Sequence, residues 1–298
     1  MTVARLRLDA LQQAVLECLA YSDVFDYPLT ADEVWRRLPY EACRQEVEAA
    51  LTSAALDELV VATPPYFVLR GREHLAAVRA RRAEASRRLF VAARRYGRMI
   101  ASLPFVRMVA VTGALAAGNS EEDDDIDYLI VTAPGRLWLA RTLTMAVVRL
   151  AALRGVTLCP NYLIAEDALA CPDRDIYTAR ELLQMRPLCG AEAYRRMLEA
   201  NAWWRDYLPN LDPDPFQGPP PLASRLLRSL GEPILRGRAG DALEAWCFRR
   251  KARELRNRGD GNGEAVFEAN VCKGHFDAHR ARTQAALAAR LARLGVEP

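Results

Sequence analysis

Apolar and polar positions along residues 9–71 follow the spacing of three helices and a short pair of strands. Apolar residues recur at helical spacing in LQQAVLECLAY, and a second helix is predicted to begin after Thr30, where Glu33 completes a capping box. A third helix is predicted over residues 41–53. Two β-rich runs then flank a turn in LVVATPPYFVLRG, which predicts a hairpin.

A long helix is predicted over residues 75–101, with one apolar face and one cationic face. The cationic face carries Arg79, Arg81, Arg82, Arg87, Arg88, Arg94, Arg95 and Arg98. A solvated helix that connects two domains has this pattern. An electropositive wall for a nucleotide or a nucleic acid has it too, and the sequence leaves both interpretations open.

After Pro104 the pattern changes to alternating strands and helices. Strands are predicted in VRMVAVT, DIDYLIV and VTLCPNYLI, with an acidic loop after the first and a helix over about residues 136–154 after the second. This alternation predicts an α/β unit with a partly parallel sheet. From about Thr178 onward the apolar residues follow helical spacing.

Together these patterns predict a mixed α+β and α/β fold in three parts. Residues 1–74 are predicted to form a winged helix, and residues 75–177 a connecting helix followed by the α/β unit. Residues 178–298 are predicted to form an α-helical C-terminal domain. Winged helices often bind DNA, but the third helix here carries Arg44 among three glutamates, which suits phosphate poorly.

Composition and charge narrow the functional classes. Of 298 residues, 51% are hydrophobic and 27% charged, as in globular proteins, and a net charge of +3 is too small to imply a polyanionic partner. Seven cysteines without a C-x-x-C pair predict reduced, mostly buried thiols in a cytoplasmic protein. There is no basic-then-apolar leader, and Arg141 and Arg149 interrupt the most apolar helix, so neither secretion nor a membrane partner is predicted. A Ser/His/Asp hydrolase has no support, because there is no G-x-S-x-G and all three histidines lie outside the α/β core.

A run of carboxylates leads directly into the second apolar strand of the α/β unit, in EEDDDIDYLIV. Residues 121–124 fit a solvated loop. Asp125 and Asp127 fall on one face of the strand, because successive side chains of a strand alternate. Two carboxylates about 7 Å apart repel one another unless a cation lies between them. The pattern predicts Mg²⁺, which binds one or two carboxylates together with substrate phosphates.

A candidate phosphate cradle lies at the end of the preceding strand. Gly113 has no Cβ to block a ligand, and Ala114 and the LAAGN segment ending at Asn119 can start a helical turn whose free N–H groups face an anion. Gly113, Ala114 and Asn119 are therefore candidate nucleotide-binding residues.

The stretch TGALAAGNSEEDDDIDYLIV resembles the signature of the DNA polymerase β-like nucleotidyltransferase superfamily. That signature is a strand, Gly-[Gly/Ser], a variable segment, and Asp-h-[Asp/Glu]-h on the next strand. The resemblance implies a nucleotidyltransferase-fold mixed β-sheet for the central unit. It also implies transfer of a nucleoside monophosphate from an NTP to a hydroxyl, with pyrophosphate released and two Mg²⁺ ions held by Asp125 and Asp127. Gly113 matches the glycine of the phosphate loop.

Two positions depart from this pattern. Ala114 stands where the family has Ser or Gly, which removes a hydroxyl but keeps the backbone N–H. On the strand that should carry a third carboxylate, Asn161 can ligate a metal through its carbonyl oxygen but is a poor general base. Glu166 and Asp167 follow closely, and whether either reaches the site is left open. Arg141, on the helix after the second strand, is a further candidate phosphate partner.

The sequence therefore predicts a cytoplasmic, Mg²⁺-dependent nucleotidyltransferase, with Mn²⁺ as an alternative metal and ATP as the favoured NTP. Asp125 and Asp127 are the predicted catalytic residues, and Asn161 joins them as a metal ligand. The acceptor is unidentified: a nucleic-acid end, a protein or a small molecule remains open. The rival prediction, which Ala114 and Asn161 favour, is a winged-helix regulator or adaptor whose nucleotidyltransferase-like domain binds nucleotide without turnover.

Overall fold

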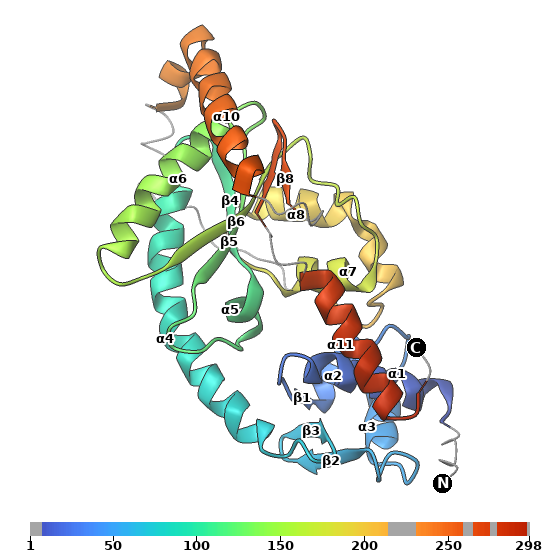
Figure 1. The fold of residues 1–298 in the computed structure, drawn as a ribbon. Coiled ribbons are helices and arrows are strands. Elements are labelled where there is room, and N and C mark those ends of the chain that lie inside the picture. The colour runs from blue at the N-terminus through green and yellow to red at the C-terminus, as the bar shows by residue number, and fades with distance from the viewer. Residues whose placement is uncertain (1–7, 214–230, 259–264, 275–278, 297–298) are drawn as a thin grey trace.

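The computed structural model describes residues 8–213, 231–258, 265–274 and 279–296. Across these ranges the chain is a mixed α and β protein with a three-stranded and a six-stranded sheet (Figure 1). The predicted mixed fold class is confirmed. Within the same ranges, no helix combines the length and the apolar character needed to cross a membrane.

The first part of the chain is a helical unit with a small antiparallel sheet. It consists of α1 (Ala10–Asp23), β1 (Leu29–Thr30), α2 (Ala31–Arg37), α3 (Arg44–Leu51), β2 (Val60–Thr63) and β3 (Tyr66–Leu69). The predicted capping box of α2 is present: the Glu33 N–H donates to Thr30 Oγ1 at 3.2 Å, and the Thr30 N–H donates to Glu33 Oε2 at 2.9 Å. β3 pairs with both β1 and β2, and Leu16, Val34 and Val47 are fully buried between helices and sheet.

The long helix α4 (Leu75–Ala101) joins the first part to the larger sheet and has the predicted bounds. It contacts β3 at one end and β4 and β7 at the other. Several of its arginines pair with glutamates: Arg79 with Glu33, Arg82 with Glu121, Arg87 with Glu84, and Arg88 with Glu84 and Glu122. The first half of its cationic face is thus largely neutralised, as expected of a connector.

The six-stranded sheet has the order β7-β4-β5-β6-β9-β8. Its strands are β4 (Val106–Val111), β5 (Ile126–Thr132), β6 (Leu158–Ala165), β7 (Arg186–Cys189), β8 (Val266–Phe267) and β9 (Val271–Lys273). Only β5 and β6 run parallel, and every other neighbouring pair is antiparallel. The prediction of a partly parallel sheet is confirmed.

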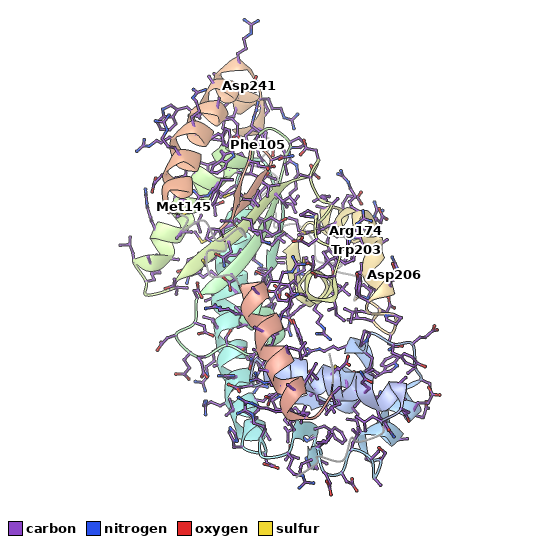
Figure 2. The ribbon with its side chains drawn as sticks, turned by 45° about the vertical axis from the view of Figure 1, so that its right-hand side comes forward. Phe105, Met145, Arg174, Trp203, Asp206 and Asp241 are labelled. Atoms are coloured by element: carbon purple, nitrogen blue, oxygen red, sulfur yellow. The ribbon has the colours of Figure 1, made fainter. Side chains whose placement is uncertain are left out.

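Helices cover both faces of this sheet. On one face α4 and α6 (Leu137–Ala152) share an apolar cluster with Tyr128 and Ile130 of β5, and α10 (Arg238–Arg258) packs on α6 and β8. On the other face α7 (Ile176–Gln184) and α8 (Ala191–Ala200) pack against Leu129 and Val131. A 3₁₀ helix (Ala202–Asp206) follows α8. Figure 2 shows Met145 and Asp241 on the α6 and α10 side and Trp203 on the α8 side.

The region 178–298, predicted to be helical, also supplies β7, β8 and β9 to the sheet. These strands have two to four residues, too few for strand alternation to show in the sequence. The last helix, α11 (His279–Arg293), packs on α1 of the first part. There Leu291 is buried, and Arg290 Nε donates to Asp23 Oδ2 at 2.6 Å. All seven cysteines are free thiols and four of them are buried, as predicted.

Candidate functional site

The two predicted catalytic carboxylates lie where β5 begins. Asp125 precedes the strand and Asp127 is its second residue. Pairing with β4 brings this end of β5 against the turn before the short helix α5 (Gly113–Ala117), and the Thr112 N–H donates to the Asp127 carbonyl oxygen at 3.0 Å. Ile126 and Tyr128 on the opposite face are fully buried, which fixes the register of β5 and hence the face that carries the carboxylates.

Gly113 lies directly against Asp127. Its φ of +64° is in the left-handed region, which is costly for a residue with a Cβ. A Cβ at this position would also lie 2.5 Å from Asp127 Oδ2. The structure thus brings together the predicted phosphate-loop glycine and a predicted catalytic carboxylate. Ala114, the next residue, is exposed to solvent.

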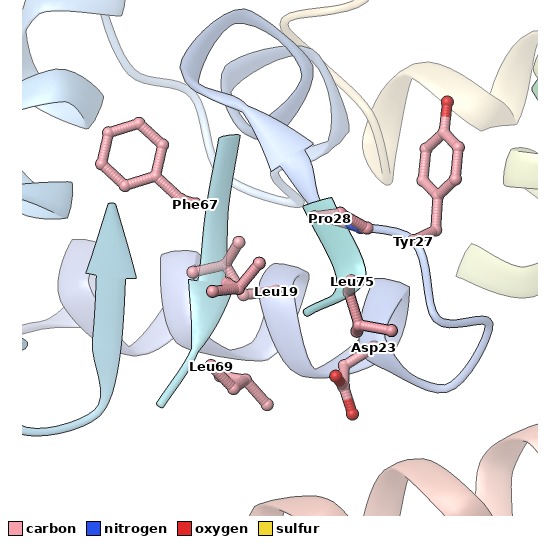
Figure 3. Close-up of a pocket in the computed structure, with 8 residues that line it drawn as sticks. Leu19, Asp23, Tyr27, Pro28, Phe67, Leu69 and Leu75 are labelled. Atoms are coloured by element: carbon pink, nitrogen blue, oxygen red, sulfur yellow. The ribbon is translucent and has the colours of Figure 1, made fainter. Parts of the chain in front are cut away.

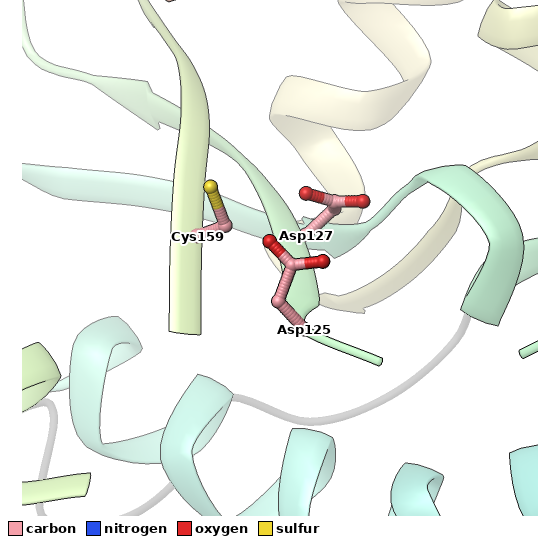
Figure 4. Close-up of side chains that lie close together, drawn as sticks. All are labelled: Asp125, Asp127 and Cys159. Carbon is pink, nitrogen blue, oxygen red and sulfur yellow. The ribbon is translucent and has the colours of Figure 1, made fainter. Parts of the chain in front are cut away.

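Cys159 completes a cluster of donor atoms with the two carboxylates. It lies on β6 opposite Asp127 in the parallel pair. Its Sγ and one carboxylate oxygen each from Asp125 and Asp127 all lie within 4.8 Å of one another (Figure 4). Cys159 was not among the residues predicted for the site. The signal lay in LCPNYLI, where a cysteine stands two residues before the predicted ligand Asn161.

Asn161 reaches the site but faces it with its amide nitrogen. Its Nδ2 donates to Asp127 Oδ1, while its Oδ1 accepts a hydrogen bond from Cys159 Sγ at 2.7 Å. In this arrangement Asn161 orients Asp127 and does not offer its carbonyl oxygen as a ligand. A half-turn of the amide would exchange the two atoms.

Several carboxyl groups lie close together at the site, and the protein shields them partly from solvent. Burial, aided by Asp125, Glu181 and Asp124, raises the pKa of Asp127 to about 7. Burial also raises the pKa of the Cys159 thiol to about 12, with the two aspartates adding to the effect. Near neutral pH a cation at this position would favour the ionised form of Asp127 and release its proton.

Glu181 and Lys273 are two further charged residues that the sequence analysis did not single out. The Glu181 side chain on α7 reaches solvent, yet the protein around it desolvates the carboxyl and raises its pKa. Lys273 of β9 partly offsets that shift and pairs in the sheet with Tyr162 of β6. No motif marked either residue, because they meet the site only through the pairing of β6 with β9 and the packing of α7.

Two predicted nucleotide contacts lie away from the carboxylates. Asn119 Nδ2 donates to the Phe25 carbonyl at 2.9 Å and its Oδ1 accepts from Arg82 at 3.4 Å, so its side chain is used to join the first part of the chain. Arg141 on α6 contacts Cys272 in the core on the opposite face of the sheet. The helical pattern placed Arg141 on a helix but not on a face of the sheet.

Glu166 does not supply a third carboxylate. It follows the last residue of β6, whereas Cys159 is near the first, so the two lie about 23 Å apart along the strand. There Glu166 pairs with Arg196 at 3.2 Å and with Arg107 at 3.7 Å. Asp167 follows it at the same end and is exposed.

The acidic loop before β5 is more ordered than a solvated loop. Glu121 Oε1 accepts from Arg82 Nε at 2.7 Å, and Asp124 Oδ2 accepts from the Glu121 N–H at 2.9 Å. Glu122 pairs with Arg88 at 3.3 Å, whereas Asp123 is exposed. These contacts hold the loop before β5 against α4. The prediction that residues 121–124 form a solvated loop therefore fits Asp123 best.

Comparison of the chain with protein-family models, with curated proteins and with solved structures found no match.

Proposed function

We propose that the chain is a divalent-cation-dependent nucleotidyltransferase of the DNA polymerase β-like superfamily, with a winged helix in residues 1–74 and a catalytic unit in residues 75–177 whose sheet is completed by β7, β8 and β9. One observation carries the proposal. Gly113, in a conformation and contact that only glycine fits, lies against Asp127, and Asp125 and Cys159 place their donor atoms beside the same carboxylate. A glycine turn beside paired carboxylates suits a metal-bound phosphate.

The donor atoms fit Mg²⁺ or Mn²⁺ as the cation. Magnesium binds one or two carboxylates together with phosphate oxygens, and Asp125 and Asp127 supply two. Cys159, with a pKa of about 12, stays a neutral thiol near pH 7 and suits a hard cation poorly. The bound cation would supply charge neutralisation for the phosphates and polarisation of the acceptor hydroxyl.

The chain's own residues would bind the cation and the phosphate and would orient the carboxylates. Asp125 and Asp127 hold the cation, and the Nδ2 of Asn161 fixes the orientation of Asp127. The missing side chain of Gly113 lets the Asp127 carboxylate approach the turn closely, and the N–H groups of Gly113 and Ala114 at the start of α5 would bind a phosphate oxygen. The proposal assigns no nucleic-acid acceptor, because Arg44 of α3 is neutralised by Asp32 and Glu48.

The test is label transfer from each α-labelled NTP, with Mg²⁺ or Mn²⁺, to candidate hydroxyl acceptors. Asp125→Asn and Asp127→Asn should abolish transfer and pyrophosphate release while circular dichroism shows the fold retained. Asp123→Asn is the matched control, because Asp123 lies in the same acidic loop but is exposed and outside the donor cluster. Equal activity of Asp127→Asn and Asp123→Asn would refute the proposal.

A nucleotide-binding regulator or adaptor without turnover is the second candidate. The observation that favours it is Asn161, which stands where a third carboxylate is expected and donates to Asp127. Cation-dependent NTP binding that requires Asp127, without release of pyrophosphate with any acceptor, would establish this function instead.

A further inference from the structure

Two cavities lie in and beside the first part of the chain. The smaller, lined by Leu19, Asp23 and Leu75 among others (Figure 3), has a volume of about 10 Å³ and holds at most one water molecule. The larger is a cleft of about 670 Å³ between the first part and the helices α5 and α7. Its volume falls within the range of about 300–1,000 Å³ that is usual for small-molecule sites.

The cleft has cationic and aromatic walls. On the side of the first part its lining includes Tyr21, Tyr27 and Arg37, and on the side of α7 and β7 it includes Arg180, Gln184 and Arg186. Neither Asp125 nor Asp127 lines it. It borders the proposed catalytic site, because Gln184 Nε2 donates to the Gly113 carbonyl at 3.2 Å.

Two of the arginines are held by tyrosine rings. The Arg180 guanidinium lies 3.8 Å from the centroid of the Tyr21 ring, and that of Arg37 lies 5.2 Å from the centroid of the Tyr27 ring. Arg180 also hydrogen-bonds the Tyr21 side chain, and Arg37 that of Tyr27. Each guanidinium has further N–H groups that can form hydrogen bonds with an oxyanion. These side chains are therefore ordered before a ligand binds.

The charge of the cleft is not balanced by its own acids. In the part of the chain that the structure describes, no ion pair joins Arg37, Arg180 or Arg186 to a carboxylate, whereas Arg36 pairs with Asp32 at 2.9 Å. Of the two lining acids, Glu33 is already bound by Arg79 at 2.6 Å. Asp212 is the other, so three arginines face one further carboxylate.

We infer that this cleft binds a small molecule that carries a phosphate group. Three arginines in one lining favour phosphate over a single carboxylate, because phosphate offers more oxygens to bidentate guanidinium groups. The volume of about 670 Å³ suits one small molecule. The inference is independent of nucleotidyl transfer, since it uses residues of α1, α2, α7 and β7 and none of the carboxylate cluster.

The test is titration calorimetry of the full chain with inorganic pyrophosphate in EDTA. Without a divalent cation, Asp125 and Asp127 repel pyrophosphate, so binding reports the cleft. We expect measurable binding, and Arg180→Gln and Arg186→Gln should each weaken it about tenfold. Arg186 is exposed, and its guanidinium lies over the ring of Phe90 and not over a tyrosine of the cleft. Arg186→Gln therefore tests the cleft even if Arg180→Gln, which removes the contact with Tyr21, perturbs folding.

The matched control is Arg195→Gln, an exposed arginine on α8 that pairs with Glu192 and Glu199 and does not line the cleft. It should bind pyrophosphate as the unmodified chain does. Absence of binding in EDTA, or equal weakening by Arg195→Gln and Arg186→Gln, would overturn the inference. Tighter binding of a 5′-phosphorylated oligonucleotide than of pyrophosphate at the same salt concentration would replace the small molecule by a nucleic acid.

Discussion

The contact between Gly113 and Asp127 gives the sharpest test of the site, through Gly113→Ala. The added methyl group meets two costs: a φ of +64°, worth about 1–2 kcal/mol for a non-glycine residue, and overlap with Asp127 Oδ2 at 2.5 Å, worth about 1–3 kcal/mol. Gly118 separates these costs, because its φ is +73° and a Cβ there would meet nothing within 4 Å. Gly118→Ala should therefore lower the free energy of unfolding by the first amount alone.

The measurement is urea unfolding of both variants at pH 8, followed by the same pair in an Asp127→Ala background. Removal of the carboxylate should make Gly113→Ala as mild as Gly118→Ala, and the double-mutant cycle isolates the contact. In the unmodified background the displaced carboxylate should also weaken Mn²⁺ binding. Equal costs for the two glycine substitutions, with or without Asp127, would refute the close approach and with it the geometry on which the proposed function rests.

Three further predictions concern pH, reactivity and packing. Folding raises the pKa of Asp127 from 3.8 to about 7, so its contribution to the stability of the cation-free protein is fully present below pH 4 and is lost as the pH rises through 7. The urea midpoint of the unmodified chain should therefore fall over this pH range, and Asp127→Asn should flatten the fall. An unchanged profile in the variant would contradict the pKa shift. The Cys159 thiol has a pKa near 12 and should react with iodoacetamide at pH 8 at least about tenfold more slowly than the exposed Cys43. Mass spectrometry measures both rates, and equal rates would disprove the desolvation of Cys159. Leu291→Ala should lower the free energy of unfolding by about 2–4 kcal/mol, because the Leu291 side chain is only 3% exposed. Leu153 is 84% exposed, so Leu153→Ala should lower it by less than about 0.5 kcal/mol. Similar losses would mean that α11 does not complete the core of the first part.

Hydrophobic spacing and capping residues in the sequence predicted the features that depend on residues close together in the chain. The bounds of α4 and the Thr30 capping box follow from spacing and from side chains three residues apart, and the structure has both. The placement of Gly113 against Asp127 also followed, because β4 and β5 are consecutive strands and pair along their length. In each case the residues that interact are near in sequence or lie on consecutive strands.

Residues that depend on distant pairing could not be predicted in the same way. Cys159 opposes Asp127 only because β5 and β6 pair in parallel, with a register shift that no local pattern encodes. Lys273 enters through β9, a strand of three residues. Arg141 was placed on the correct helix, but helical spacing does not say which face of the sheet that helix covers. The site thus combines one locally encoded contact with several that only the whole sheet defines.

The return of α11 to the first part of the chain has a consequence for synthesis. Residues near the amino terminus build most of a core there, and Leu291, more than 200 positions later, fills a place in it. A chain leaving the ribosome therefore carries this first unit with an apolar gap until Leu291 has been made. Its folding should finish late, and a chain cut short before α11 should expose that gap to chaperones and proteases.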